Sequence, residues 1–420
     1  MSLASLRPAT GRFLHLVHDD KYIDAARAVF EEAAPGAHDF LVIGSPGSAF
    51  RHLRSFTPAC CELEMLLHAP VLRQLPDYSA VLVHALDDAA RLVVHAAPDS
   101  TCFLWMAWGS DYYHLLRAER ELLLPRTGAL VGELRDDPDR PARRRAVVGG
   151  HLVGLARAAT QPRQAIQRYR RRRTLRSIGA GRPGEIGLLN RFRGFAVTHE
   201  DFDGIRQGHP AFDVPLLDWN CYWAESFDPD RCPDGPTGGD VLLGNSATPT
   251  NNHLEALELL ADILPAGRRV VCPLSYGDAR YGDAIESAGH RLLGDRFLPL
   301  REYMEPHAYA EVLGACSVVV MNHRRQQAAG NIVFALCSGA HVFLRAENSL
   351  VASLRRLGVD VHDMEGLADF LRRGGGTPVA GADLAAVRSR IGSRFGRPSI
   401  LATTRAMLAR LAQAHEREAA

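Results

Sequence analysis

The sequence predicts an α/β protein of two domains, each with a parallel sheet flanked by helices. Three observations support this prediction. The 420 residues exceed the length of one ordinary domain. Short apolar runs alternate with helical patterns, as they do in βα units. A segment rich in Pro, Gly and Asp, residues 226–240, lacks any periodicity and separates the two halves. We therefore expect domains at residues 1–225 and 241–420, joined by a linker at 226–240.

The apolar runs indicate where the strands lie. In the first half, strands are expected at residues 13–17, 40–43, 80–84, 102–107 and 195–198. In the second half they are expected at residues 241–243, 269–272, 317–321 and 341–344. Helical patterns cover residues 23–34, 253–264, 282–288, 307–315 and 331–338. A long helix after residue 399 is expected to pack back on the first domain, and the irregular, basic stretch 117–182 predicts an insertion.

Composition excludes several classes of protein. The chain is 46% apolar and 23% charged, which is typical of globular proteins and not of disordered ones. A net charge of +1 does not favour a general binder of polyanions. The first twenty residues lack the apolar core of a signal peptide. The longest uncharged run, residues 326–344, contains Gln, Asn, Ser, His and glycines, and predicts a buried helix and strand instead of a membrane span.

The eight cysteines show neither CxxC spacing nor a metal-like cluster. This pattern indicates reduced, mostly buried thiols and a cytoplasmic protein. No DxD-like motif occupies a suitable loop, so no metal is expected.

One segment is strongly basic. Seven arginines lie between Arg163 and Arg176 with no acidic residue among them. They fit either a solvated helix or a surface for anionic lipid headgroups or a pyrophosphate-linked acceptor. No base-stacking aromatic pattern accompanies them, so nucleic acid is not an expected partner.

The first polar loop of the second half follows the strand at 241–243. It contains Gly244, Asn245 and Ser246, and Asn252 precedes a helix. Glycine allows a ligand to approach the backbone, and a helix N-terminus attracts phosphate. Taken alone, the loop is equally an ordinary capped βα connection.

Three further strand-end loops carry similar chemistry. Because the carboxyl ends of parallel strands meet at one edge of a sheet, all four loops are expected to form one nucleotide site. Arginine neutralises phosphate, amides donate hydrogen bonds, and a carboxylate binds ribose hydroxyls. Glu347 and Asn348 also fit a helix cap, and Tyr276 fits either base stacking or the core. The candidate donor-binding residues of these loops are Pro273, Tyr276, Arg325, Gln326, Gln327, Gly330, Asn331, Glu347 and Asn348.

The first half contains an aromatic cluster after the strand at 102–107. Trp108, Tyr112 and Tyr113 suit a carbohydrate acceptor, since aromatic faces pack on sugar C–H groups. Asp111 is a candidate general base, and also fits a turn. His84 ends another strand and is the second catalytic candidate, although histidines in such places are often structural.

Taken together, these motifs resemble the bacterial TDP-N-acetylfucosamine:lipid II N-acetylfucosaminyltransferase family. The matching stretches are Trp108-Gly-Ser-Asp-Tyr-Tyr113, Leu243-Gly-Asn-Ser246 with Asn252-His253, Pro273 with Tyr276, Arg325-Gln-Gln-x-x-Gly330, and Arg345-x-Glu-Asn348. The resemblance implies the GT-B fold, two Rossmann-like domains facing each other across a cleft. It also implies a TDP- or UDP-sugar donor held by the second domain, a lipid-linked or other glycan acceptor, and no metal or other cofactor. The protein would then work peripherally at the inner face of the cytoplasmic membrane.

Other functions stay open on the sequence alone. The same fold is used by sugar-nucleotide 2-epimerases, although these need no acceptor platform. A glycosyltransferase acting on a protein or a small molecule, or a binding module without turnover, also fits. The sequence does not distinguish an inverting from a retaining reaction.

Overall fold

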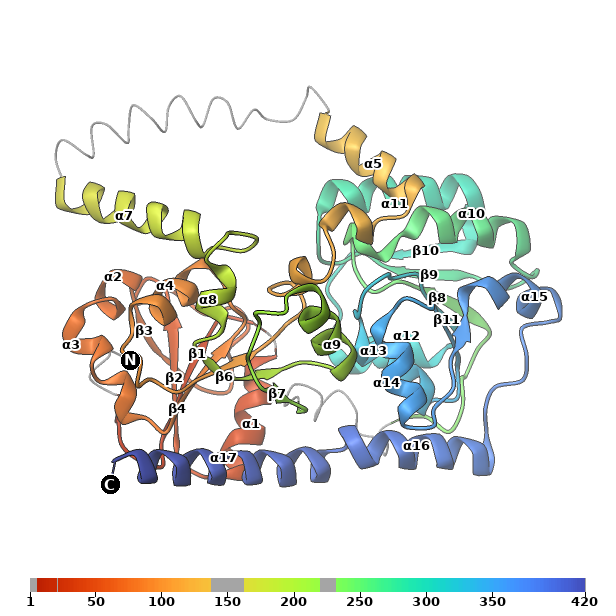
Figure 1. Cartoon of the computed structure of the whole chain (residues 1–420). Coiled ribbons are helices and arrows are strands. Elements are labelled where there is room, and N and C mark those ends of the chain that lie inside the picture. The colour runs from red at the N-terminus through yellow and green to blue at the C-terminus, as the bar shows by residue number, and fades with distance from the viewer. Residues whose placement is uncertain (1–5, 21, 137–161, 220–231, 420) are drawn as a thin grey trace.

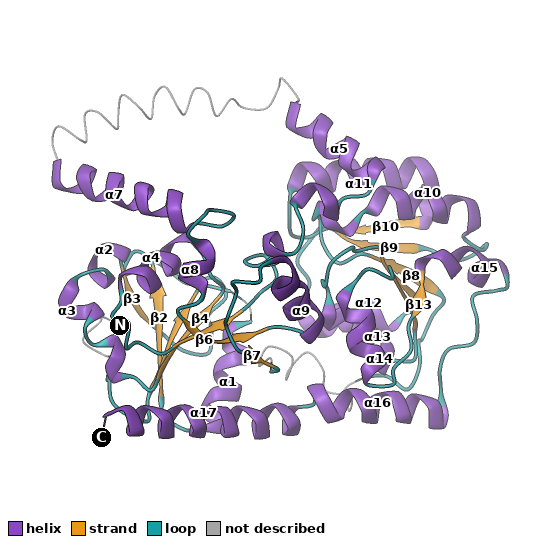
Figure 2. Ribbon diagram, viewed as in Figure 1, coloured by secondary structure: helices purple, strands orange, loops and turns teal. Residues whose placement is uncertain are grey.

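The protein folds into two α/β domains, each built around one sheet (Figure 1 and Figure 2). This computed structural model describes residues 6–20, 22–136, 162–219 and 232–419. Strands that pair within these ranges run parallel. Separate apolar clusters lie on the two faces of each sheet. The expected fold class is confirmed.

The first sheet has the strand order β3-β2-β1-β4-β5-β6-β7. All residues of its central strands β1 and β4 are buried, as expected for a parallel sheet covered on both faces. The strands are β1 (Phe13–Val17), β2 (His38–Ile43), β3 (Ala59–Cys61), β4 (Ala80–His84), β5 (Phe103–Met106), β6 (Phe192–Ala196) and β7 (Leu216–Leu217). The helices between them are α1 (Ile23–Ala33), α2 (Leu63–Leu66), α3 (Ala69–Leu72), α4 (Asp88–Ala96), α7 (Pro162–Ile178), α8 (Glu185–Leu189) and α9 (His199–Gly208).

The second sheet has the order β10-β9-β8-β11-β12-β13. Its strands are β8 (Asp240–Leu243), β9 (Val270–Pro273), β10 (Phe297–Leu300), β11 (Cys316–Met321), β12 (His341–Leu344) and β13 (His362–Asp363). Its helices are α10 (His253–Ile263), α11 (Ala279–Leu293), α12 (Pro306–Gly314), α13 (Ala329–Cys337), α14 (Ser349–Arg356), α15 (Leu367–Arg372) and α16 (Gly381–Phe395).

Two helices cross between the domains. Figure 1 shows α5 (Pro125–Asp136) against α10 and α11 of the second domain, although it precedes β6 of the first. The Thr127 hydroxyl of α5 donates to Glu255 at 2.6 Å, and Val131 joins the second core. In exchange, α17 (Arg397–Ala419) packs on α1, and Thr404 accepts a hydrogen bond from the Trp219 indole at 2.8 Å. The two domains are therefore held together by exchanged helices.

The expected elements are present and differ mainly in length, whereas β10, α4, α9, α14, α15 and α16 were not expected. Helix α11 starts earlier than expected because Asp278 caps it by accepting a hydrogen bond from the backbone of Tyr281. The strands β3, β7 and β13 have only two or three residues and carry too little pattern to predict. Residues 326–344 contain α13 and β12, which confirms a largely buried helix followed by a strand. Within the described ranges, no helix combines the length and the apolar character needed to cross a membrane.

Candidate active site

Each sheet reverses its strand order at one place. In the second sheet the chain runs outward from β8 to β10 and returns to β11 on the other side of β8. In the first sheet the same reversal falls between β1 and β4. Ligands of open α/β sheets bind beyond the carboxyl ends of the strands at such switch points. The loops after β8 and β11, and those after β1 and β4, are therefore the places to look for the site.

The loop after β8 turns at Gly244. This residue has a φ of +68°, and a Cβ there would lie 2.7 Å from both Asn251 Oδ1 and His253 Nε2. Glycine is thus required for both backbone conformation and space. The next residue, Asn245, is fixed by its backbone N–H, which donates to Asn251 Oδ1 at 3.0 Å.

Four predicted donor-binding residues form one connected chain of hydrogen bonds. The Asn245 amide donates to the Tyr276 hydroxyl at 2.8 Å and accepts from Gln327 at 2.9 Å. Arg325 Nε then donates to Gln327 Oε1 at 3.1 Å. These side chains come from the loops after β8, β9 and β11. The structure therefore brings together residues that lie about 80 positions apart in the sequence. This agrees with the expectation that the strand-end loops form one site at the edge of the sheet.

Arg325 is the unusual member of this group. Its guanidinium lies over the ring of Tyr113, 5.5 Å from the centroid, and is only partly exposed. Within the described chain Arg325 forms no ion pair with a carboxylate. Burial lowers the pKa of Arg325, although an arginine stays charged at neutral pH. A partly buried cation without a carboxylate partner has donors left for an anion.

The helix α13 begins just after Arg325. The residue that precedes it, Ala328, has a φ of 58°, a left-handed conformation that is strained for a residue with a Cβ. No side chain caps the first turn, which contains Gly330 and Asn331. Asn331 instead donates to the Tyr309 hydroxyl at 2.8 Å. The uncapped positive end of α13 adds to the positive charge of Arg325.

Glu347 lies in the loop after β12 between two arginines. It accepts hydrogen bonds from Nε of Arg324 at 3.0 Å and from Nε of Arg345 at 2.9 Å. Burial raises the pKa of Glu347, but the hydrogen bonds and charge of Arg345 and Arg324 lower it more, so the net shift is downward. The carboxylate is ionised and partly exposed, which a contact with ribose hydroxyls would need.

Most of the other predicted donor residues are buried. Asn252 has a φ of 51°, and its side chain accepts from Leu124 N at 2.7 Å and donates to the carbonyl of Leu122. Asn348 caps α14 and donates to the Arg325 carbonyl at 2.8 Å. Both therefore hold loops in place. Ser246 and Pro273 are also buried, whereas Gln326 is partly exposed.

In the first domain, Asp111 is fully engaged by its surroundings. It accepts three hydrogen bonds, from Leu86 N at 2.8 Å, from the Trp105 indole at 2.8 Å and from Trp108 N at 2.9 Å. These bonds join the loops after β4 and β5. The geometry is that of a clamp between two loops, and it counts against the predicted role as general base.

Tyr112 and Tyr113 are buried, in contrast to the open acceptor platform that the sequence predicted. Their hydroxyls donate to Asp201 at 2.6 and 3.1 Å. Burial raises the pKa of Asp201, and the hydrogen bond from Tyr112 partly offsets this rise. Trp108 stays partly exposed and is the cluster's remaining candidate for contact with a sugar.

His84, the other catalytic candidate, has no exposed surface. Its Nε2 lies 2.9 Å from Nδ1 of His15, and burial lowers the pKa of His84 to about 3. The next residue, Ala85, has a φ of 65°. His84 therefore lies at the switch point of the first sheet but beneath its surface.

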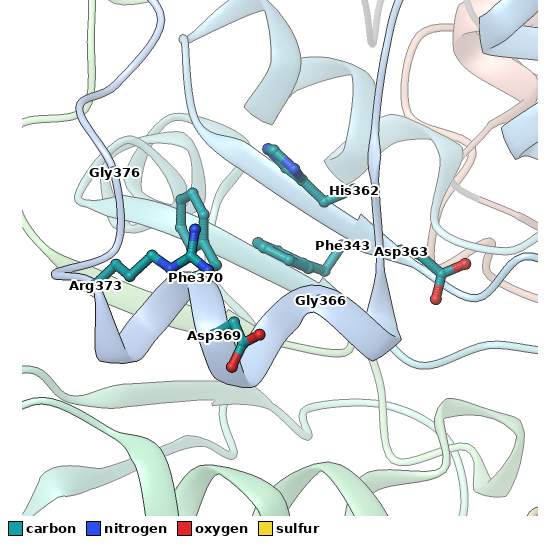
Figure 3. Close-up of a pocket in the computed structure, with 8 residues that line it drawn as sticks. All are labelled: Phe343, His362, Asp363, Gly366, Asp369, Phe370, Arg373 and Gly376. Carbon is teal, nitrogen blue, oxygen red and sulfur yellow. The ribbon is translucent and has the colours of Figure 1, made fainter.

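A cavity of about 400 Å³ lies away from these loops, at the edge strand β13. Figure 3 shows the rings of Phe343, His362 and Phe370 gathered there, with Arg373 beside Phe370. None of the predicted site residues lines this cavity. The candidate site is therefore the cluster of loops at the switch point and not this cavity.

Sequence reasoning missed several residues that shape the site. Asp201 carried a weak signal, since Thr198 and Asp201 fit a helix cap, and Thr198 does accept a hydrogen bond from Asp201 N. Asn251, which directly precedes Asn252, was not predicted. His18, partly exposed directly after β1, gave no signal because the strand order was unknown.

The comparison with known proteins matches the donor loops of the second domain to a protein family and leaves most of the first domain unmatched. Residues 195–366 match the family described as 4-alpha-L-fucosyltransferase glycosyl transferase group 56. The matched stretch begins in β6 and contains every predicted donor-binding residue, from Gly244 to Asn348. It excludes the aromatic cluster and His84.

Solved structures match almost the whole chain. Sucrose-phosphate synthase from Thermosynechococcus elongatus matches with a TM-score of 0.58 and 12% identity, over 96% of this chain and 99% of that one. Anabaena HepE in complex with UDP and glucose matches with a TM-score of 0.60 and 13% identity, over 95% and 99%. A glycosyltransferase from Rickettsia africae ESF-5 matches with a TM-score of 0.57 and 11% identity, over 95% and 98%.

At these identities the structures establish the fold, two Rossmann-like domains facing each other across a cleft. The family match establishes the resemblance that the motifs predicted. Residues 195–366 are thus similar to the glycosyl transferase group 56 family, and the chain has the GT-B fold seen in glycosyltransferases.

Proposed function

We propose that the protein transfers a sugar from a pyrimidine nucleoside diphosphate to an acceptor hydroxyl, with the diphosphate bound by Arg325 and the N-terminus of α13. The observation that carries the proposal is the Arg325 guanidinium, which lies at the switch point without a carboxylate partner in the described chain. A charge-assisted bond to phosphate would satisfy its free donors. The uncapped end of α13 would stabilise the same charge.

The remaining groups of the loop cluster suit the rest of a nucleotide. Tyr276 is half-exposed at the end of β9, where its ring can stack on a base, and Asn245 holds its hydroxyl. Glu347 would bind the ribose. A pyrimidine donor, TDP or UDP, agrees with a neighbour of the same fold, HepE, which was solved with UDP and glucose.

The reaction would need no metal ion or other cofactor. As the leaving diphosphate gains charge, Arg325 and the dipole of α13 would stabilise it, which is the task that a divalent cation performs in other enzymes. We therefore expect nucleotide binding to be insensitive to chelators.

We infer the donor sugar and the acceptor from the resemblance to this family. Its resemblance supports a TDP-activated deoxy-acetamido sugar, N-acetylfucosamine, and a polyprenyl-diphosphate-linked saccharide of surface polysaccharide synthesis. Such an acceptor would be reached at the inner face of the cytoplasmic membrane. Trp108, which follows β5, would pack on the acceptor sugar.

The basic helix α7 supports attachment to an anionic membrane. Its exposed arginines are joined on the surface by Tyr169 and Ile166, which are 65% and 53% exposed. Arginines with a few apolar side chains favour anionic headgroups. One arginine, Arg171, pairs with Glu64 of α2 and fixes the helix to the domain. The side chain of Arg163 lies outside the described residues.

A nucleotide panel tests the proposed function. TDP, UDP, ADP and GDP are titrated into the protein by calorimetry, with and without EDTA. Pyrimidine diphosphates are expected to bind more tightly than purine diphosphates, and equally well with the chelator. Labelled TDP- and UDP-sugars then separate transfer or hydrolysis from epimerisation. Equal binding of all four nucleotides, or binding of none, would refute the donor assignment.

A further inference from the structure

Three hydrogen-bonded histidines cross the first sheet beneath the cleft. Nδ1 of His38 lies 3.0 Å from Nε2 of His15, and Nδ1 of His15 lies 2.9 Å from Nε2 of His84. They stand on the adjacent strands β2, β1 and β4. His15 and His84 have no exposed surface, and the rings of Phe30 and Phe40 pack on His15. The row runs from the start of β2 to the end of β4.

The row has a preferred direction. Nε2 of His38 is buried and forms no hydrogen bond of normal geometry among the described residues, although the Phe30 backbone is close enough to raise the pKa of His38. A buried N–H without an acceptor is rarer in proteins than a lone pair without a donor. His38 is thus best placed with its proton on Nδ1, donating to His15. His15 then donates from Nδ1 to His84, which must carry its own proton on Nδ1.

His18 lies at the cleft end of this row. In the sheet register Leu16 pairs with Val83, so His18 follows β1 one position beyond the level of His84. Its imidazole is partly exposed and forms no hydrogen bond within the described part of the chain, and its ring lies 6.4 Å from that of Trp108. A charge on His18 is one cause, after burial, of the lowered pKa of His84.

We propose that His18 is the general base for the acceptor hydroxyl, and that His84, His15 and His38 are positioning residues forming a hydrogen-bonded row behind it. The proposal rests on the glycosyltransferase function. His18 is accessible at the switch point, whereas Asp111 is engaged by three donors and His84 is covered.

The reaction balances without any other reactant. The acceptor oxygen forms a bond to the anomeric carbon of the donor sugar, and its proton passes to an imidazole nitrogen of His18. The bond from the anomeric carbon to the diphosphate oxygen breaks, and its electron pair leaves with the diphosphate. Attack opposite the leaving group inverts the anomeric configuration. The charge that develops on His18 is returned to solvent when the proton leaves.

The ionisable groups around His18 are few. On its own loop, Asp19 accepts hydrogen bonds from the backbone of residues 51–53, and Asp20 accepts one from Tyr22 N. The β4 side contributes His84. The β5 loop contributes Asp111, which binds Trp108 N. Burial lowers the pKa of His38 to about 4 and that of His84 to about 3, so a second charge beside His18 is unfavourable. The row is therefore expected to stay neutral.

Nitrogen NMR of the full chain with ¹⁵N-labelled histidine tests the row directly. Signals are assigned with single variants and followed from pH 5 to pH 8. His15, His38 and His84 are expected to stay neutral throughout, with the proton of each on Nδ1. A charged row at pH 6, or a proton on Nε2 of His84, would overturn the proposal. This measurement needs no substrate, so it stands if the donor assignment fails.

Kinetics test the base. With a donor that the wild type turns over, His18→Gln is expected to lower kcat by about 10²–10⁴ and leave the Kd of TDP or UDP unchanged. His68→Gln, an exposed histidine beside α3, is the control and should keep wild-type turnover. The product of the wild type should have inverted configuration. Retained configuration, or His18→Gln turnover within about threefold of wild type, would exclude the base role.

His15 variants separate positioning from mere stability. His15→Phe keeps a ring between Phe30 and Phe40 but cannot bond to His84. We expect it to shift the acid limb of the pH–rate profile and to lower kcat about tenfold, on the scale of an orienting partner. His15→Gln, which can donate and accept, should restore part of both. A changed melting temperature with an unchanged pH profile would show that the row is only structural.

Discussion

The hydroxyl of Tyr113 accepts a hydrogen bond from the backbone N–H of Gln326 at 2.6 Å, and so ties the loop after β5 to the loop after β11. The same hydroxyl donates to Asp201 and lies 3.4 Å from the Ser349 hydroxyl. Its ring supports Arg325. One first-domain side chain thus fixes the geometry of the proposed diphosphate site.

Tyr113→Phe tests this latch. The ring that supports Arg325 stays, while Gln326 N–H and Asp201 each lose a partner. A stability loss of about 1–3 kcal/mol is expected, since buried polar groups are left unpaired. Affinity for TDP or UDP should fall several-fold, as measured by calorimetry. Tyr112→Phe is the control, because Tyr112 bonds to Asp201 within the first domain only. Equal nucleotide affinity in both variants would show that the latch does not position the site.

Arg325→Ala should weaken binding of the pyrimidine diphosphate by about 1.5–3 kcal/mol, the scale of a charge-assisted hydrogen bond. Arg269→Ala is a matched control, because Arg269 pairs with Asp240 at the opposite, amino-terminal edge of the same sheet. Glu347→Ala should also weaken nucleotide binding without unfolding the domain. If Arg325→Ala and Glu347→Ala bind like wild type, the donor site lies elsewhere.

Asp111→Asn distinguishes a clamp from a base. Three N–H groups point at this carboxylate, and an amide can accept from them through one oxygen only. We therefore expect a loss of about 1–3 kcal/mol in the free energy of unfolding, measured by urea titration. A general base would behave differently: turnover would fall by about 10²–10⁴ while stability stayed at the wild-type value.

Acid should destabilise the protein through its buried histidines. Burial lowers the pKa values of His253 and His323 to about 3, while unfolded histidine has a value near 6.5. Below about pH 6.5 these histidines bind protons in the unfolded chain but stay neutral in the folded chain. Each such histidine then removes about 1.4 kcal/mol of stability per pH unit, until its folded pKa is reached. Urea unfolding at pH 7, 6 and 5 measures this slope, and a stability independent of pH would contradict it.

The sequence predicted the fold and the donor loops because both depend on local pattern. Buried strands appear in the sequence as apolar runs. The Gly, Asn and Arg residues that follow these runs indicated the donor loops. Which loop residues face the cleft was not predictable, since Asn252 and Asn348 have the same chemistry as Asn245 but bond to Leu124 and Arg325 backbone atoms. Those partners depend on tertiary structure.

The first domain was harder for the same reason. Asp111 beside tryptophans suits a sugar site, yet its partners include Leu86 in the loop after the neighbouring strand β4 and Trp105 of β5. The row of His15, His38 and His84 joins residues up to 69 positions apart, which only the strand order brings together. Exchange of α5 between the domains likewise leaves no local trace in the sequence.

Membrane attachment through α7 is the last prediction. Arg172 and Arg173 are exposed and have no ion pair within the described residues, so both can approach headgroups. Each basic side chain near an anionic surface contributes about 1 kcal/mol, so the double Gln variant should bind anionic liposomes about 30-fold more weakly. Flotation with phosphatidylglycerol vesicles at low and high salt measures this, and salt should weaken wild-type binding.

Arg372 and Arg373, exposed near α15 of the second domain, give a control double variant of equal charge. Equal loss in both double variants would indicate a net-charge effect, and strong binding to neutral vesicles would exclude an electrostatic surface.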